Sequence, residues 1–431
     1  MKQQSAQTKT KRGTPDFQLL ILTLLLVGFG LLMVFSSSSS IAIANSSFNN
    51  DPLYFTKKQL MWAVIGLVGM FFAMNIRFNK YKKLYAPFFL FTTVLLVLVL
   101  VTGAMLNGAR SWIRIFGFSL QPAEFAKIAI ILYLSALITK KGERFRDLKT
   151  GYIPVLVIVG FIAGLIMLQP DFGTCFILVS TCGLVIYAGG ASMKHIMGSI
   201  LLVVLGGALA LGANALFSSM SPSDAIDSTT AASAEQNYKI GRIQAFLDPL
   251  SDTSGGSLNL FRSLVAIGDG GMTGSGIGQG TMKLHYLPNA YNDFIFSVIG
   301  EELGFLGSTL FLLVYLYFIW RGIIVSLRCP DPFGTLVGIG IMGLIAIQAF
   351  INIGGVTQTI PVTGVTLPFI SYGGTSLFVM MVAMGILLSI SRTNNQDVIK
   401  EERTKSVTVQ TQTRTSPALR SRDSKSIRRI R

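Results

Sequence analysis

The stretch Leu287-Pro288-Asn289-Ala290-Tyr291-Asn292-Asp293 runs directly into the apolar run Phe294 to Ile299, and this junction decides how the rest of the chain is interpreted. It places the carboxylate of Asp293 where a membrane helix would meet water. An ionisable group buried there without a partner costs several kcal/mol, about 2.5 to 3.5 even on permissive insertion scales, so a functional role is the first hypothesis. The alternative is that Asp293 caps the helix, because an aspartate before an apolar run also satisfies free backbone amides.

The composition predicts an all-α polytopic membrane protein. Of 431 residues, 51% are hydrophobic and only 13% are charged, with a mean hydropathy of +0.59, a balance that soluble globular domains of this size do not show. Windows of about 20 apolar residues predict ten membrane spans, at residues 17–35, 60–76, 84–102, 122–139, 152–169, 172–189, 196–217, 293–320, 334–354 and 368–391.

The charge distribution predicts the orientation of these spans. The net charge is +16, and the densest basic connectors, residues 77–83 and 140–149, lie on the same side as the N-terminal arm. The positive-inside rule makes that side the cytoplasm and places both termini there. The loops 36–59, 103–121, 218–292 and 355–367 then face outward, and Asp293 lies at the outer membrane face. Because the positive charge is explained in this way, nucleic acid is not expected as a partner.

The chain divides into three parts. Residues 1–16 form a basic cytosolic arm, residues 17–391 form the transmembrane domain, and residues 392–431 form a disordered, basic cytosolic tail suited to contact with anionic membrane lipids. We interpret the first apolar run as an anchor and not as a cleaved signal. Within the outer loop, residues 218–236 are small and polar, whereas 238–291 combine aromatics, charges and glycines in a pattern that favours order. The three cysteines fit neither a disulfide framework nor a metal site and are interpreted as packing residues.

The glycine-rich run 268–280 (GDGGMTGSGIGQG) admits two interpretations. Its backbone amides could approach a phosphate closely, or the run could simply turn tightly; it lacks the context of a nucleotide-binding loop. Lys283 follows the run and could supply a point charge to a pyrophosphate at the membrane surface. The alternative for Lys283 is a lysine that snorkels to the interface.

Two further stretches carry charge near the outer face. Arg110-Ser111-Trp112-Ile113-Arg114-Ile115-Phe116 alternates charged with bulky apolar residues, which is typical of a segment lying in the interface. Glu124 and Lys127, spaced i and i+3 at the start of the fourth span, suit either helix capping or a functional ion pair. Asp171 marks an outer turn, where an aspartate satisfies local hydrogen bonds.

The remaining titratable residues exclude several enzyme classes. Glu301 and Glu302 would lie about 12 Å deeper than Asp293 along a helix, at 1.5 Å per residue, so they cannot share one small reaction centre with it. A glycosidase-like pair of carboxylates is therefore disfavoured. The two histidines provide no cluster of metal ligands, and the sequence contains no recognisable nucleophilic triad.

Four stretches together resemble one known family, the SEDS family of bacterial cell-wall proteins. They are 112–127 (WIRIFGFSLQPAEFAK), 169–173, the segment from 242–252 (RIQAFLDPLSD) through 263–268 to GEELG at 300–304, and 352–376 (NIGGVTQTIPVTGVTLPFISYGGTS). The last is specific enough to identify the family alone. The resemblance covers almost all of the predicted spans.

The resemblance implies a fold and an activity. Members are similar in topology to the prediction made from the spans, with ten helices, cytosolic ends in the bacterial plasma membrane and a large outer loop between helices 7 and 8. It implies a peptidoglycan glycosyltransferase that polymerises lipid II into glycan strands beside a class B penicillin-binding protein and other divisome or elongasome proteins. The family's essential aspartate falls on Asp293. The motif here reads PNAYNDFIF, with Asn289, Tyr291 and Asn292 in place of the more frequent Glu, His and Thr.

The chemistry implied by the resemblance agrees with the residues. One carboxylate, Asp293, suffices as general base because pyrophosphate is already a good leaving group. Cations would stabilise the developing charge, and the expected substrate-binding residues are Lys283, Arg110, Arg114, Glu124, Lys127 and Arg242. A bound divalent cation, Mg²⁺ or Mn²⁺, is an alternative source of positive charge, and no organic cofactor is expected.

Two alternatives belong to other functional classes. Ten spans with glycine, proline and buried charge also fit a transporter, or flippase, of the lipid-linked precursor, and the basic tail also fits a non-catalytic scaffold for division proteins. Within the family, Thr366 in TGVTLPF and the YLP before the active loop resemble the division type more than the elongation type.

Overall fold

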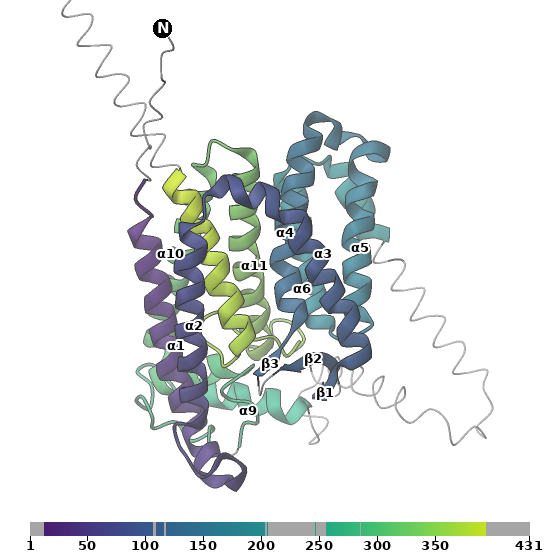
Figure 1. Cartoon of the computed structure of the whole chain (residues 1–431). Coiled ribbons are helices and arrows are strands. Elements are labelled where there is room, and N and C mark those ends of the chain that lie inside the picture. The colour runs from purple at the N-terminus through teal and green to yellow at the C-terminus, as the bar shows by residue number, and fades with distance from the viewer. Residues whose placement is uncertain are drawn as a thin grey trace, which may run out of the picture.

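The protein is a bundle of apolar helices with a small sheet and a short amphipathic helix at one end (Figure 1). The computed structural model describes residues 13–106, 109–115, 118–202, 205, 246, 256–284 and 286–393. Within these ranges, eight helices are long and apolar enough to cross a membrane, and two shorter apolar helices accompany them. The predicted all-α polytopic class with about ten helices is confirmed. Four predicted parts lie wholly or mostly outside the described residues: the arm 1–16, the tail 392–431, the seventh span and the first half of the outer loop.

Most helices extend beyond the predicted spans. The long ones are α1 (Phe17–Ala44), α2 (Tyr54–Asn75), α3 (Phe78–Thr102), α4 (Pro122–Lys141), α5 (Ile153–Met167, preceded by a π-helical turn at Leu148–Tyr152), α10 (Ile295–Leu327), α11 (Pro332–Val356) and the last helix, Gly374–Thr393. The shorter ones are α6 (Phe172–Ala188), Met193–Leu202 and the amphipathic α9 (Gly256–Asp269).

Aspartates cap several of these helices. Asp16, Asp171 and Asp331 accept hydrogen bonds from the backbone amides of Leu19, Thr174 and Phe333 at the starts of α1, α6 and α11. Each bond satisfies one of the amides that a helix start leaves free. For Asp171 this confirms the predicted local role, and its second carboxylate oxygen accepts from Gln121 at 3.1 Å.

Three helices form the centre of the bundle. In α4, α11 and the last helix, 72%, 72% and 78% of the most apolar window is buried, whereas in α3 only 17% is buried. Beyond its first, basic turns, the most exposed side chains of α3 are mainly apolar, among them Leu90, Phe91, Val94 and Val101, as expected of a helix that faces lipid. One buried cluster joins α1, α2, α10, α11 and the last helix, and a second joins α4, α5 and α6 with parts of α3 and α11. The three free cysteines lie within this helical body, two of them buried.

The segment after α3, predicted to lie in the interface, forms a three-stranded antiparallel sheet of β1 (Ala104–Leu106), β2 (Ala109–Ile115) and β3 (Phe118–Leu120), in which Arg114 pairs with Ser119. Successive residues of a strand face opposite sides, so Trp112 and Arg114 share one face of β2 and Ile113 lies on the other. The sheet lies at the same end of the bundle as α9 (Figure 1).

Helix α10 is broken near its start, and the glycine-rich segment supplies hydrogen-bond partners for the backbone groups at the break. Gly304 adopts φ 65° and ψ −167° inside α10. The carbonyls of Glu301 and Glu302 accept from the amides of Ser275 and Gly276 at 3.0 Å, and the amides of residues 305 and 306 donate to the carbonyls of residues 271 and 272 at 2.8 and 3.1 Å. The backbone groups that the break frees are thus satisfied by protein, as an apolar environment requires.

The contact between the two backbones predicts the effect of a substitution at Gly304. A Cβ at this position would lie 2.2 Å from the amide nitrogen of Gly274, and the positive φ is itself unfavourable for alanine. We expect Gly304→Ala to destabilise the protein by on the order of 3 kcal/mol, measured as a lowered midpoint of thermal unfolding in detergent. Gly268→Ala is the control, because no atom lies within 4 Å of the added Cβ. Equal midpoints for the two variants would contradict the role of Gly304.

Candidate active site

Asp293 lies in the turn that leads into α10. The N-cap position of α10 is Phe294, one residue after Asp293, and the helix begins at Ile295. Asp293 is partly exposed, whereas the residues that follow it, from Phe294 to Glu302, are buried. The carboxylate therefore belongs to the last accessible position before the chain enters the bundle.

Asn352 of α11 holds the backbone of Asp293. Its side-chain amide donates to the carbonyl of Asp293 at 2.8 Å and to the carbonyl of Val365 at 2.7 Å. Asn352 is only 4% exposed, so these bonds form where water does not compete and where an unpaired carbonyl would be costly. One side chain therefore fixes the turn that carries Asp293 relative to the segment before the last helix.

An aromatic cluster lies beside Asp293. The ring of Tyr291 lies 4.5 Å from that of Phe55 and 5.7 Å from that of Tyr372, between centroids, and the amide of Tyr372 donates to the carbonyl of Tyr291 at 2.9 Å. Burial, followed by the nearby Asp293 carboxylate, raises the pKa of Tyr291 above its ordinary value, and burial raises the pKa of Tyr372 to about 12. Both phenols are therefore neutral at physiological pH and cannot act there as bases.

Two of the three departures from the family motif, Asn289 and Tyr291, have a local explanation in the structure. Asn289 has φ 57°, in the left-handed region that asparagine tolerates better than most residues. Tyr291 is accommodated by the aromatic cluster. Nothing in the structure explains Asn292, whose side-chain oxygen is buried without a hydrogen-bond partner among the described residues.

Glu124 and Lys127 form a buried ion pair, as one of the two interpretations predicted. Their charged atoms lie 2.8 Å apart, and Lys127 also donates to Gln348 of α11 at 2.9 Å. Gln348 in turn donates to the carbonyl of Thr366 at 3.0 Å. Gln348 and Asn352 lie one turn apart on the same face of α11. Gln348 binds Thr366, and Asn352 binds the neighbouring Val365 as well as Asp293. Hydrogen bonds therefore connect the Glu124–Lys127 pair to the segment before the last helix, which Asn352 joins to Asp293. The second carboxylate oxygen of Glu124 has no partner among the described residues.

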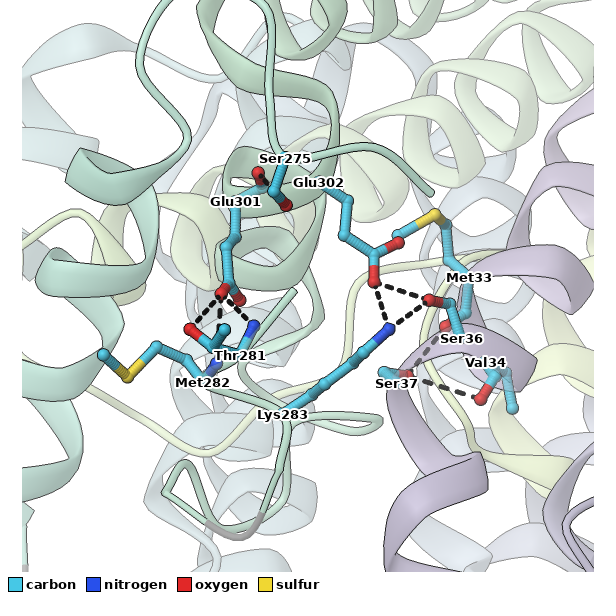
Figure 2. A network of polar contacts seen from close by, with 10 residues as sticks. All are labelled: Met33, Val34, Ser36, Ser37, Ser275, Thr281, Met282, Lys283, Glu301 and Glu302. Atoms are coloured by element: carbon cyan, nitrogen blue, oxygen red, sulfur yellow. Dashed lines mark hydrogen bonds and ion pairs between the residues drawn. The ribbon is translucent and has the colours of Figure 1, made fainter. Parts of the chain in front are cut away.

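Lys283 is buried in a second ion pair (Figure 2). Its ammonium lies 2.6 Å from a carboxylate oxygen of Glu302 and 3.0 Å from the hydroxyl of Ser36 in α1, and that hydroxyl donates to the same carboxylate oxygen at 2.6 Å. Lys283 is 3% exposed. It is therefore not a snorkelling lysine, because its charge is held inside the protein.

The carboxylate of Glu301 accepts hydrogen bonds from the two residues before Lys283. One of its oxygens accepts from the amide and hydroxyl of Thr281 and from the amide of Met282 at 3.0 Å, as Figure 2 shows. Glu301 and Glu302 are thus both engaged by residues 281–283.

The three predicted arginines are placed unequally. Arg114 lies on β2 and is exposed. Arg110 lies on the same strand, but its side chain falls outside what the structure describes, and Arg242 lies outside the described residues altogether. Of these three arginines, the structure therefore places the side chain of Arg114, on the sheet that lies at the same end of the bundle as α9.

The sequence predicted one site for a phosphate and one for a divalent cation. The glycine run is no phosphate cradle in this conformation, because the amides of Gly274, Ser275 and Gly276 all donate to backbone carbonyls. Among the described residues, no three His, Cys, Asp or Glu side chains gather closely enough to hold a metal ion by themselves. A divalent cation held partly by substrate stays a prediction.

Sequence reasoning missed Gln348, Asn352 and Ser36. The first two are amides four residues apart in an otherwise apolar helix, and such side chains usually mark a polar contact between helices. This spacing was the available signal. Ser36 stands in a run of five serines, which gives no indication of the one that faces Glu302.

The bonds of Asn352 generate a prediction. In Asn352→Leu, two buried carbonyls lose their donor, which we expect to cost about 1 to 3 kcal/mol and to loosen the turn around Asp293. The measurement is amide hydrogen exchange over residues 291–297, with thermal unfolding recorded in parallel. Asn79→Leu, at an exposed asparagine of α3, is the control. Unchanged exchange in Asn352→Leu would contradict the role of Asn352.

Curated relatives cover most of the chain. Stage V sporulation protein E of Bacillus subtilis is 41% identical over 385 residues, which are 89% of this chain and 98% of that protein. Proteins described as probable peptidoglycan glycosyltransferase FtsW are 37% identical in Trichlorobacter lovleyi, over 87% of this chain and 93% of the relative, and 37% identical in Bacillus subtilis, over 87% and 90%.

Solved structures share the fold. A chain from the structure described as "Structural coordination of polymerization and crosslinking by a peptidoglycan synthase complex" is 25% identical with a TM-score of 0.67, covering 88% of this chain and 98% of that chain. The rod shape determining protein RodA of Thermus thermophilus is 23% identical with a TM-score of 0.58, covering 88% and 97%. The family model of FtsW, RodA and SpoVE, described as "Cell cycle protein", matches residues 17–396. The chain therefore belongs to the SEDS family, the family of FtsW, RodA and SpoVE.

Proposed function

We propose that the protein is a peptidoglycan glycosyltransferase that polymerises lipid II into glycan strands, with Asp293 as general base. The observation that carries this proposal is the placement of Asp293. It is a partly exposed carboxylate in a turn held by Asn352, where α10 enters the bundle. Family membership and the names of the FtsW relatives support the same activity.

The proposed reaction needs only one carboxylate from the protein. The 4-hydroxyl of an acceptor GlcNAc attacks C1 of the donor MurNAc, and its proton passes to the carboxylate of Asp293. The new glycosidic C–O bond forms as the bond from C1 to the pyrophosphate oxygen breaks, and the configuration at C1 inverts. Undecaprenyl pyrophosphate leaves as a stable anion, so no general acid is required.

The location of Asp293 suits a substrate with an apolar tail and a polar head. The polyprenyl chain of lipid II would stay in lipid while its sugars reach the accessible turn before α10. Arg114, with Arg110 and Arg242, is proposed to stabilise the pyrophosphate charge. Glu124 and Lys127, predicted to bind substrate, are buried as an ion pair, so they are proposed to support the substrate site through Gln348. A divalent cation, Mg²⁺ or Mn²⁺, would add positive charge at the pyrophosphate.

The protein's partner and its orientation in the membrane follow from the same function. We propose a class B penicillin-binding protein as the partner that cross-links the product, together with divisome or elongasome proteins. The distribution of basic connectors supports cytoplasmic termini and an outward-facing Asp293 in a bacterial plasma membrane. Thr366 favours the division type, although the relatives include a sporulation protein as well as FtsW proteins.

The role of Asp293 is tested by its isosteric substitution. We expect Asp293→Asn to abolish formation of glycan polymer from purified lipid II, a loss of at least about 100-fold, because the amide cannot accept the proton. The assay uses the purified protein with its penicillin-binding partner and follows polymer length on gels. Asp269→Asn, at an exposed carboxylate that ends α9, is the matched control and should keep activity. Undiminished polymer from Asp293→Asn would refute the assignment.

The same reconstitution separates the alternatives. A flippase would make labelled precursor accessible on the far side of a vesicle without forming polymer. A scaffold would do neither. Polymer that depends on Asp293 supports the enzyme over both.

A further inference from the structure

We propose that Lys283, Glu302 and Ser36 form a positioning cluster that holds the segment carrying Asp293 in its reactive place. In this proposal Lys283 acts through Glu302 and does not contact the substrate's pyrophosphate. The inference rests on the proposed function. It concerns three residues from α1, α10 and the segment before Asp293, drawn together in Figure 2.

The cluster lies well inside the bundle. Glu302 is seven residues past the start of α10, and Ser36 is eight residues before the end of α1, so both lie about 10 to 12 Å from these helix ends at 1.5 Å per residue. Lys283 reaches them from a segment without regular secondary structure. All three are buried, with exposures of 4%, 3% and 1% for Ser36, Lys283 and Glu302. A free pyrophosphate would have to displace Glu302 to reach this ammonium.

The segment from 281 to 293 is attached at both of its ends. At its start, residues 281 and 282 bind the carboxylate of Glu301, and Lys283 binds that of Glu302. At its end, Asn352 holds the carbonyl of Asp293. Between these points the side chains of Leu287 and Ala290 are buried, with exposures of 1% and 0%. The ion pair therefore fixes Lys283, ten residues before the carboxylate, next to the two residues that Glu301 holds.

The energetics favour positioning over general stabilisation. A buried ion pair loses hydration when it forms, and its replacement by neutral residues of similar volume is often neutral or stabilising. Removal of only one partner is unfavourable, because the other charge remains buried without compensation. A pair that adds little net stability can still determine one arrangement of the segment, since in the part of the chain that the structure describes Lys283 is ion-paired with Glu302 alone.

The test is a double-mutant cycle in the full protein with its partner. We expect Lys283→Met and Glu302→Gln each to lower kcat by roughly 10- to 100-fold, with KM for lipid II changed less than about twofold. The double variant Lys283→Met/Glu302→Gln should regain the thermal midpoint of the wild type, because no buried charge is left unpaired, but its kcat should stay as low as in the single variants, because the pair that positions the segment is absent. Hydrogen exchange over residues 287–294 should rise in each single variant and stay raised in the double variant.

Two outcomes would overturn the proposal. If Lys283 contacts pyrophosphate, Lys283→Met raises KM for lipid II by much more than twofold and leaves exchange over residues 287–294 unchanged. If the pair only stabilises the fold, kcat of the folded variants and exchange over 287–294 stay at the wild-type level. Should the single variants not fold, the folded double variant decides: a low kcat with raised exchange supports the proposal, and kcat and exchange at the wild-type level overturn it.

A matched control and the wild type separate this inference from the proposed function. Lys57 and Asp51 form an exposed ion pair at 2.7 Å, and Lys57→Met/Asp51→Asn should leave kcat and exchange unchanged. Absence of polymer from the wild-type protein would sink the proposed function and not the inference. In that case the exchange measurements still decide whether the cluster positions residues 287–294.

Discussion

The break in α10 at Gly304 is the constraint on which the candidate site depends. In the apolar part of a membrane protein, every backbone amide and carbonyl that leaves a helix must find another protein partner. Here the carbonyls of residues 301 and 302 and the amides of residues 305 and 306 find theirs in residues 271–276. The glycine-rich segment is consequently drawn against α10, and the contact is close enough that glycine is needed on both sides.

This contact brings charged residues into the bundle in pairs. Once residues 271–276 lie along α10, the chain that follows presents Lys283 to Glu302, so neither charge is buried alone. The same rule governs the pair of Glu124 and Lys127 in α4, which Gln348 connects to the segment before the last helix. Since isolated buried charges are unfavourable, each pair ties together parts of the chain that are remote in sequence.

Both pairs are connected to the turn that carries Asp293. One fixes the start of the segment leading to it, and the other belongs to a chain of hydrogen bonds that ends near Asn352, whose amide holds the carbonyl of Asp293. The carboxylate itself stays partly exposed, while the phenols beside it are kept neutral by burial. In the proposed reaction this division suits a base that must be accessible to a sugar hydroxyl on an otherwise rigid support.

The sequence by itself determined the membrane class, a bundle of about ten apolar helices, the accessible position of Asp293 and the spacing of Glu124 and Lys127. Each of these follows from hydropathy, charge or local helical geometry, which act over short stretches of chain. It could not determine that Lys283 pairs with Glu302, 19 residues away, through Ser36, 247 residues away, or that the glycine run binds backbone instead of phosphate. Only the tertiary structure decided these, because partners for buried charges and freed backbone groups are chosen by which segments the fold brings together.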